Sequence, residues 1–199
     1  MSIRLANQED IPQILAIYAP YITDTTFSFE YTVPDRETFT RRFLAIASAF
    51  PWLVWEENGE ILGYAYGSLP FERAAYAWCC EASVYLRQDV RRRGIGKQLY
   101  CALEHLMMLQ GYKSVYAIIT SENKDSLLFH EAMGYKTVAT FPNCGYKKGT
   151  WLGTVWMEKP LANLSHPAAM PLPFPEIMTR FENLSNIFDQ SPLSQVKKI

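Results

Sequence analysis

A short basic loop with two glycines, residues 91–96, constrains the fold of this chain more than any other stretch. It follows an apolar run at residues 82–86 and opens a run in which apolar residues recur at helical spacing, at Ile95, Leu99, Ala102, Leu103 and Leu106. This order predicts a strand, a tight loop and a helix. Such a loop aims several backbone N–H groups at one anion, and the helix dipole and basic side chains favour the same charge. We expect it to bind a phosphate or pyrophosphate.

Two well-known phosphate-binding loops do not fit this stretch. A P-loop needs Gly-Lys followed by Ser or Thr, whereas Gly96-Lys97 is followed by Gln98, and Arg91 stands where the first glycine belongs. The dinucleotide-binding fingerprint needs a third glycine, and Leu99 occupies that place. The remaining pattern is Arg-x-x-Gly-x-Gly. Its other interpretation is an ordinary glycine loop with a basic surface patch.

Size and charge favour one enzyme-sized domain with a small ligand. With 199 residues and a hydrophobic fraction of 49%, the chain is long enough for one large α/β domain with a well-formed core. The formal net charge is -1, so no overall basic field favours a nucleic acid. The basic cluster at residues 87–97 is local, which favours a small anionic ligand over a polymer.

The cysteines and the apolar runs predict a cytoplasmic protein without a metal. The four cysteines form no C-x-x-C pair and the three histidines are scattered, which argues against a zinc site. Cys79 and Cys80 are neighbours on a predicted strand, so they point to opposite faces and are poor disulfide partners. No signal peptide opens the chain and no apolar run reaches membrane-spanning length. We therefore expect no membrane partner.

The periodicity predicts the mixed order β-α-α-β-β-β-α-β-α-β-β, which is not the strict alternation of a doubly wound sheet. Asn58-Gly59 between two apolar runs is a strong hairpin signal. Gly111 and Gly134 are typical helix ends. Strands are expected at about residues 2–6, 52–57, 61–68, 76–86, 114–119, 135–141 and 151–158, and helices at about 7–18, 34–49, 95–110 and 124–133.

The character of the chain changes at residue 160. Five prolines between residues 160 and 175 break any regular element. Beyond them, residues 177–188 have the pattern of one short amphipathic helix, with Ile177, Phe181, Leu184 and Phe188 on its apolar face. We interpret residues 1–160 as the domain and residues 161–199 as an appended Pro-rich extension.

Several ordered segments resemble the phosphinothricin and methionine sulfoximine N-acetyltransferase branch of the GNAT superfamily. They are residues 29–30, 73–76, 81–86, 91–96, 123–126, 128–131, 133–135 and 145–151. The resemblance implies the GNAT acyltransferase fold, a mixed and mostly antiparallel α/β sheet with helices on both faces. It also implies acetyl-CoA as cosubstrate and a homodimer. Two departures, Gly153 where the branch commonly has Asp and the pair Cys79-Cys80, bear on the substrate more than on acetyl transfer.

Acetyl transfer to an amine needs a base, because a free amine is largely protonated near neutral pH. Glu81 lies in an otherwise apolar strand, and the resemblance implies that it is the general base, acting directly or through a water molecule, for direct attack by the amine. The alternative is a solvent-facing or salt-bridged Glu81. The resemblance also places a functional histidine at His130, where a neutral imidazole near the thioester can relay a proton. The alternative is a packing residue.

The resemblance places acetyl-CoA along the strand and the glycine loop. The backbone of Val84, Tyr85 and Leu86 is the predicted pantetheine edge, which binds an amide-bearing arm like an extra strand. The N–H of Val84 or Tyr85 is expected to polarise the thioester carbonyl. Asn123 is either a helix cap or a further contact to the ligand. The predicted pyrophosphate cradle consists of Arg92, Arg93, Gly94, Ile95, Gly96 and Lys97.

For the acceptor, the resemblance points to Phe29, Glu30, Arg73 and Tyr76. The planar guanidinium of Arg73 suits a carboxylate or phosphinate, which favours a small amino-acid-like substrate. Two other functions stay open: an acetyltransferase for a protein N-terminus or a polyamine, and a non-catalytic acyl-CoA-binding module. The presence of Glu81 argues against the last of these.

Overall fold

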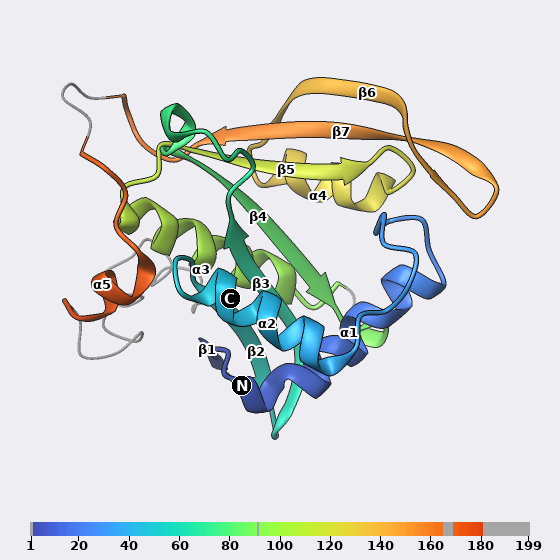
Figure 1. The fold of residues 1–199 in the computed structure, drawn as a ribbon, viewed down its shortest axis with the longest axis horizontal. Helices are drawn as coiled ribbons and strands as arrows, with labels where there is room; N and C mark the ends of the chain where they lie inside the picture. The colour runs from blue at the N-terminus through green and yellow to red at the C-terminus, as the bar shows by residue number, and fades with distance from the viewer. Residues whose placement is uncertain (1, 91, 165–168, 181–199) are drawn as a thin grey trace.

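An open seven-stranded sheet forms the body of the protein (Figure 1). The computed structural model describes residues 2–90, 92–164 and 169–180. Neighbouring strands are antiparallel except β4 and β5, which are parallel, so the predicted mixed, mostly antiparallel sheet is confirmed. The strands are β1 (Ser2–Leu5), β2 (Trp52–Glu57), β3 (Glu60–Ser68), β4 (Cys79–Leu86), β5 (Ser114–Thr120), β6 (Lys136–Lys147) and β7 (Thr150–Pro160), in the order β1-β2-β3-β4-β5-β7-β6.

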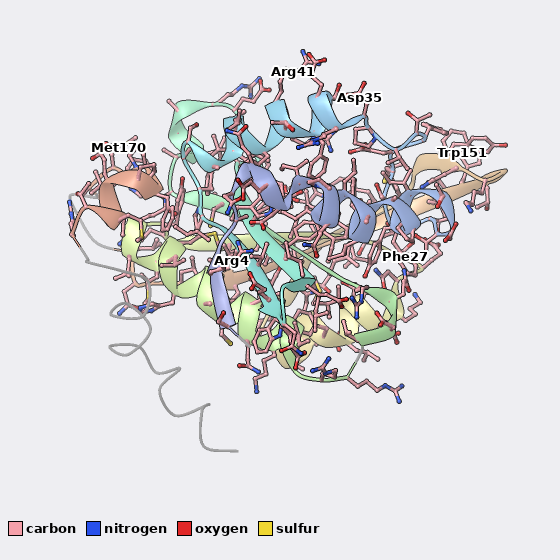
Figure 2. The ribbon with its side chains drawn as sticks, turned by 90° about the horizontal axis from the view of Figure 1, so that it is seen from below. Arg4, Phe27, Asp35, Arg41, Trp151 and Met170 are labelled. Atoms are coloured by element: carbon pink, nitrogen blue, oxygen red, sulfur yellow. The ribbon has the colours of Figure 1, made fainter. Side chains whose placement is uncertain are left out.

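Helices cover both faces of the sheet, as predicted, and give the molecule three layers (Figure 2). On one face lie α1 (Ile11–Thr23) and α2 (Arg36–Ala47), and on the other lie α3 (Ile95–Gln110) and α4 (Lys124–Ala132). Each face has its own apolar cluster. The α1 side includes Trp52 and Tyr64, and the α3 side includes Leu99 and Leu103, two residues of the predicted helical stripe.

Several element boundaries differ from the prediction, among them the end of α1, which lies at Thr23 instead of residue 18. β4 begins at Cys79 instead of residue 76, because a 3-10 turn, Ala74–Tyr76, precedes it. The second helix begins at Arg36 and not at Pro34, since the Asp35 side chain caps it by accepting a bond from the Thr38 N–H at 2.7 Å. β6 is longer than predicted. A register shift between Phe141 and Gly145 lets the strand continue past Pro142, a residue that usually interrupts strands.

β4 and β5 separate soon after they begin. Their pairing is limited to three positions and ends where Glu81 lies opposite Tyr116. On its other side β4 stays paired with β3 as far as Leu86. Within the described residues, positions 82–86 therefore pair with no strand on the β5 side, and a V-shaped gap opens in the middle of the sheet. The gap exposes the stretch of β4 in which the pantetheine edge is predicted, Val84 to Leu86.

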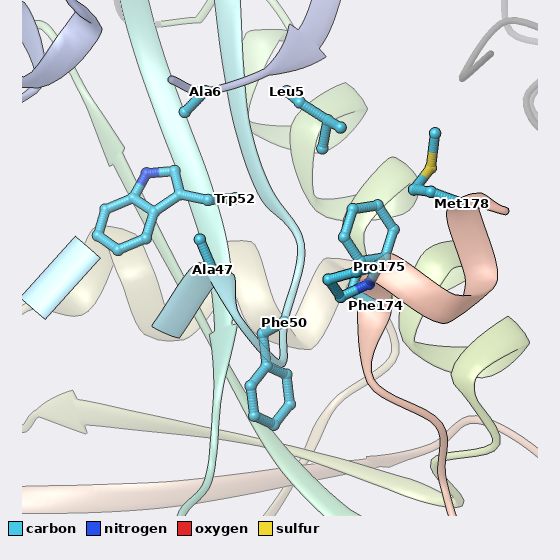
Figure 3. Close-up of a pocket in the computed structure, with 8 residues that line it drawn as sticks. All are labelled: Leu5, Ala6, Ala47, Phe50, Trp52, Phe174, Pro175 and Met178. Atoms are coloured by element: carbon cyan, nitrogen blue, oxygen red, sulfur yellow. The ribbon is translucent and has the colours of Figure 1, made fainter. Parts of the chain in front are cut away.

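The described part of the C-terminal extension packs back onto the domain. Its helix α5 (Phe174–Met178) buries Phe174 and Ile177 in the α3-side cluster. Backbone bonds tie the Leu172 N–H to Gln110 and the Phe174 N–H to Ala49. α5 also borders a small apolar cavity of about 300 Å³ beside Trp52 (Figure 3). The helix expected over residues 177–188 lies mostly outside the described residues, and the observed helix is shorter and begins earlier.

Candidate active site

Glu81 lies at the point where β4 and β5 part. Side chains alternate across a strand, so Glu81 shares its face with Tyr85, whose ring packs against Tyr18 and Tyr21 of α1. Burial raises the pKa of Glu81 to about 7. No basic side chain among the described residues forms an ion pair with it, so the salt-bridge alternative finds no support. A carboxyl with this pKa is well matched to accept a proton near neutral pH.

His130 approaches β4 from the opposite face. Its residue surface is 4% exposed, and burial lowers the pKa of His130, so the imidazole is neutral at pH 7. Nδ1 lies 2.7 Å from the Ser126 carbonyl oxygen and must carry the proton, because a carbonyl only accepts. Nε2 lies 2.9 Å from the Tyr100 hydroxyl, which in turn lies 3.0 Å from the Ala82 carbonyl oxygen. Nε2 and the Ala82 carbonyl are both acceptors, so the single hydroxyl proton of Tyr100 is donated to one of them at a time, and Tyr100 connects His130 with the β4 edge.

The backbone of β4 offers hydrogen-bonding groups to the gap. The Arg87 N–H bonds to the Leu62 carbonyl of β3 at 2.9 Å. Since backbone groups alternate along an antiparallel strand, those of Val84 and Leu86 point to the open side, whereas those of Tyr85 face β3. The Tyr21 hydroxyl lies 2.8 Å from the Leu86 oxygen and 3.3 Å from its nitrogen. Sequence reasoning missed Tyr21, because no local signal relates the end of α1 to β4.

The glycine loop has the backbone of an anion-binding site. Arg92 and Gly94 both have positive φ, 64° and 75°, and Gly94 caps α3 without a side-chain hydrogen bond. The first-turn N–H groups, from Ile95 to Lys97, therefore have no side-chain cap and point out of the helix end. Arg93 turns away from this point, because its Nη2 donates to the Glu57 carboxylate at 2.7 Å.

Asn123 caps α4. Its side-chain oxygen accepts a hydrogen bond from the Ser126 N–H at 3.2 Å. The capping interpretation is therefore confirmed, while a contact between Asn123 and a ligand stays a prediction.

The predicted acceptor residues lie in two separate loops. Phe29 and Glu30 follow α1, and the Glu30 carboxylate accepts bonds from Arg42 at 2.6 Å and from the Tyr18 hydroxyl at 3.1 Å. This loop also contacts β5, since the Thr120 hydroxyl donates to the Phe27 carbonyl at 3.0 Å.

Arg73 and Tyr76 lie in the other loop, between β3 and β4, and both are exposed. Phe71 holds this loop over the sheet by packing against Tyr116 of β5 and Trp156 of β7. Among the described residues no hydrogen bond or ion pair joins the two loops, although both border β5 beside the gap.

A metal centre finds no support in residues 2–90, 92–164 and 169–180. They contain no group of three or more His, Cys, Asp and Glu side chains that are placed to hold an ion. All four cysteines are free thiols. None of the helices in this part of the chain has the length and apolar character needed to cross a membrane.

Comparison with known sequences identifies the family. The sequence profile described as the acetyltransferase (GNAT) domain matches residues 3–156. The chain belongs to the GNAT acetyltransferases. This GNAT chain is 34% identical to a phosphinothricin N-acetyltransferase of Alcaligenes faecalis over 162 residues, which cover 80% of this chain and 82% of that protein. It is 38% identical to an L-methionine sulfoximine/L-methionine sulfone acetyltransferase of Pseudomonas paraeruginosa over 161 residues, which cover 79% and 92%.

Solved structures give the same result for the fold. A GNAT phosphinothricin acetyltransferase from Sinorhizobium meliloti, in complex with acetyl-CoA, matches this chain with a TM-score of 0.78 at 29% identity, covering 85% of this chain and 97% of that one. The predicted GNAT fold and the predicted N-acetyltransferase family are therefore confirmed.

Proposed function

We propose that this GNAT protein transfers the acetyl group of acetyl-CoA to the amino group of a small amino-acid-like substrate of the phosphinothricin or methionine sulfoximine type. The observation that carries the proposal is Glu81, a half-buried carboxyl at the gap between β4 and β5 whose pKa is raised to about 7. The names of the two relatives, which act on these compounds, support the substrate class.

The open edge of β4 and the start of α3 fit acetyl-CoA. The uncapped N–H groups of Ile95, Gly96 and Lys97 suit its pyrophosphate, and the Leu86 backbone suits an amide of its pantetheine arm in place of the Tyr21 hydroxyl. The Val84 N–H faces the gap and is assigned to the thioester carbonyl. Bound there, acetyl-CoA supplies an activated acetyl group, and the chemistry at the amine falls to Glu81.

Glu81 is proposed as the general base. Its carboxylate accepts a proton from the substrate amine as the amine nitrogen bonds to the acetyl carbon, and the carbon–sulfur bond then breaks with its electron pair leaving on sulfur as the CoA thiolate. Its position on the α1 face brings the amine from that side of β4. His130 is assigned to the opposite, sulfur side, where it acts through Tyr100.

His130→Gln is expected to lower kcat about tenfold to a hundredfold. This is less than the effect of changing Glu81, because His130 acts through Tyr100, whereas a group that transfers the proton directly contributes up to about 10⁴-fold. Tyr100→Phe, which removes the hydroxyl between His130 and Ala82, should lower kcat similarly. The measurement is kcat together with the melting temperature Tm. A lower Tm at unchanged kcat would make His130 a packing residue.

Arg73→Ala is expected to raise the KM for phosphinothricin and methionine sulfoximine about tenfold or more, since hydrogen bonds to charged groups contribute roughly 1.5–3 kcal/mol. Arg73→Lys should not restore the affinity, because a two-point grip on a carboxylate needs the planar guanidinium. Steady-state kinetics at saturating acetyl-CoA test this. An unchanged KM in Arg73→Ala would exclude this residue from the acceptor site.

The proposed function is tested by acetyl-CoA turnover with L-amino acids, methionine sulfoximine, phosphinothricin and polyamines. We expect turnover with the amino acid analogues and little with polyamines, which bring no anion for Arg73. Turnover of polyamines alone would contradict the substrate class. Acetyl-CoA binding without turnover of any amine would favour a non-catalytic acyl-CoA-binding module.

We also propose a homodimer in the cytoplasm. Exposed apolar side chains gather on β6 and β7, at Val138, Phe141, Tyr146 and Trp151, and patches of this kind are typical of interfaces. Four free thiols fit a reducing compartment.

A further inference from the structure

Lys147, the last residue of β6, is a buried lysine. The residue is 4% exposed, and its Nζ donates to the Ile22 carbonyl at 2.8 Å and to the Ser28 carbonyl at 2.6 Å. Within the described residues it forms no ion pair. Burial, and to a lesser degree the neighbouring Lys148, lowers the pKa of Lys147. Burying an ammonium group raises the free energy of the folded state unless its N–H groups find hydrogen-bond acceptors. The Ile22 and Ser28 carbonyls are therefore essential partners of Lys147.

Both carbonyls belong to the segment that carries the proposed acceptor residues. Ile22 lies in the last turn of α1, and Ser28 immediately precedes Phe29 and Glu30. A single ammonium therefore fixes the end of the helix and the middle of the following loop to one point on β6. The Ser28 side chain is held as well, because its hydroxyl lies 2.9 Å from that of Tyr18.

The neighbours of Lys147 contact the same loop. At Gly145 an added Cβ would come within 2.3 Å of the Phe29 ring, so the ring rests directly on the Gly145 backbone. The Tyr31 hydroxyl donates to the Tyr146 carbonyl, and the Lys148 ammonium donates to the Thr23 carbonyl at 2.6 Å. Figure 1 shows this end of β6 beside the loop that follows α1.

We infer that Lys147 is a positioning residue of the acceptor site: with Gly145 beside it, it sets where the loop presents Phe29 and Glu30, and so controls the affinity for the amino acid substrate. The inference rests on the proposed function, because that function assigns the loop to the acceptor. Within the described residues the hydrogen bonds of Lys147 reach neither β4 nor α3, so the acetyl-CoA site should not depend on it.

Lys147→Met tests the inference, since methionine keeps the length of the side chain and removes its donors. The KM for phosphinothricin is expected to rise about tenfold or more, as two charge-assisted hydrogen bonds are lost, while the KM for acetyl-CoA stays unchanged. Lys136→Met is the control, because Lys136 is an exposed lysine at the other end of β6. It should leave both constants unchanged. A folded Lys147→Met enzyme with an unchanged acceptor KM, or with equal rises in both constants, would overturn the inference.

Gly145→Ala keeps the test decisive if Lys147→Met does not fold. The new methyl group displaces the Phe29 ring without removing a hydrogen bond, and the same split between the two KM values is expected. An unchanged acceptor KM in this variant would overturn the inference. Wild-type enzyme is measured first, so a failure of the proposed function appears separately, as wild-type protein that acetylates no amino acid analogue.

Discussion

Glu81→Gln is expected to lower kcat about 100- to 10,000-fold, which is the usual contribution of a general base. Glutamine keeps the shape of the side chain but cannot take a proton from the amine. The affinity for acetyl-CoA should change little, because that ligand is assigned to the backbone of β4 and α3. The measurement is kcat at saturating concentrations of both substrates, and a fully active variant at neutral pH would reduce Glu81 to a structural residue.

Glu81→Gln should also change how the rate depends on pH. Since burial raises the pKa of Glu81 to about 7, the rate of the wild-type enzyme should rise with pH through about 7 as the carboxylate forms. The variant should lack this step, and its deficit should shrink at higher pH, where free amine accumulates without a base. A wild-type rate that is flat across this range would contradict the assignment.

The stability of the folded protein should change with pH in the direction opposite to the rate. The pKa of Glu81 is higher in the folded protein than its ordinary value of 4.5, so the folded state binds more protons between these values and its stability falls as pH rises through them. At about pH 8 wild-type protein carries the full cost of a buried carboxylate. Glu81→Gln should then have the higher Tm, with the advantage shrinking near pH 4.5. A lower Tm for the variant at the higher pH would contradict this.

Gly96→Val is expected to weaken CoA binding about 100-fold or more, because it crowds the helix end where charge-assisted bonds to the pyrophosphate are assigned. The domain has room for the first carbon of a side chain at this position. A Cβ at Gly96 would lie 3.4 Å from Leu86 and 3.8 Å from Phe129, which are ordinary contacts. Gly94 is a poorer choice, since its φ of 75° strains any other residue.

Calorimetric titration with CoA, together with Tm, tests the Gly96 prediction. Glu81→Gln is its matched control, since it should bind CoA normally while losing turnover. A folded Gly96→Val protein with unchanged CoA affinity would remove the glycine loop from the cofactor site.

Much of the fold follows from local signals in the sequence. The Asn58-Gly59 hairpin and the end of α3 at Gly111 were predictable, because each turn needs a positive φ that these residue types adopt: 54°, 82° and 105°. The full length of β6 was not, because a bulge that carries a strand past Pro142 depends on the partner strand.

The residues of the candidate site likewise divide into those that the sequence predicts and those that it does not. Glu81 and the glycine loop are recognisable because their signals are local: an acid in an apolar strand, and glycines before a helix. The pair of Arg93 with Glu57 and the bonds of Tyr21 to Leu86 join residues 36 and 65 positions apart, which no local pattern reveals. Lys147 was missed for another reason, since lysine is almost never buried and the sequence therefore favours an exposed position.

The substrate class of the enzyme is tested most directly by a competition between two acceptors. An equimolar mixture of L-methionine sulfoximine and spermidine is offered to the wild-type enzyme with limiting acetyl-CoA, and the acetylated products are quantified by mass spectrometry. We predict that N-acetyl-methionine sulfoximine is formed in large excess. Acetylated spermidine as the dominant product would contradict it.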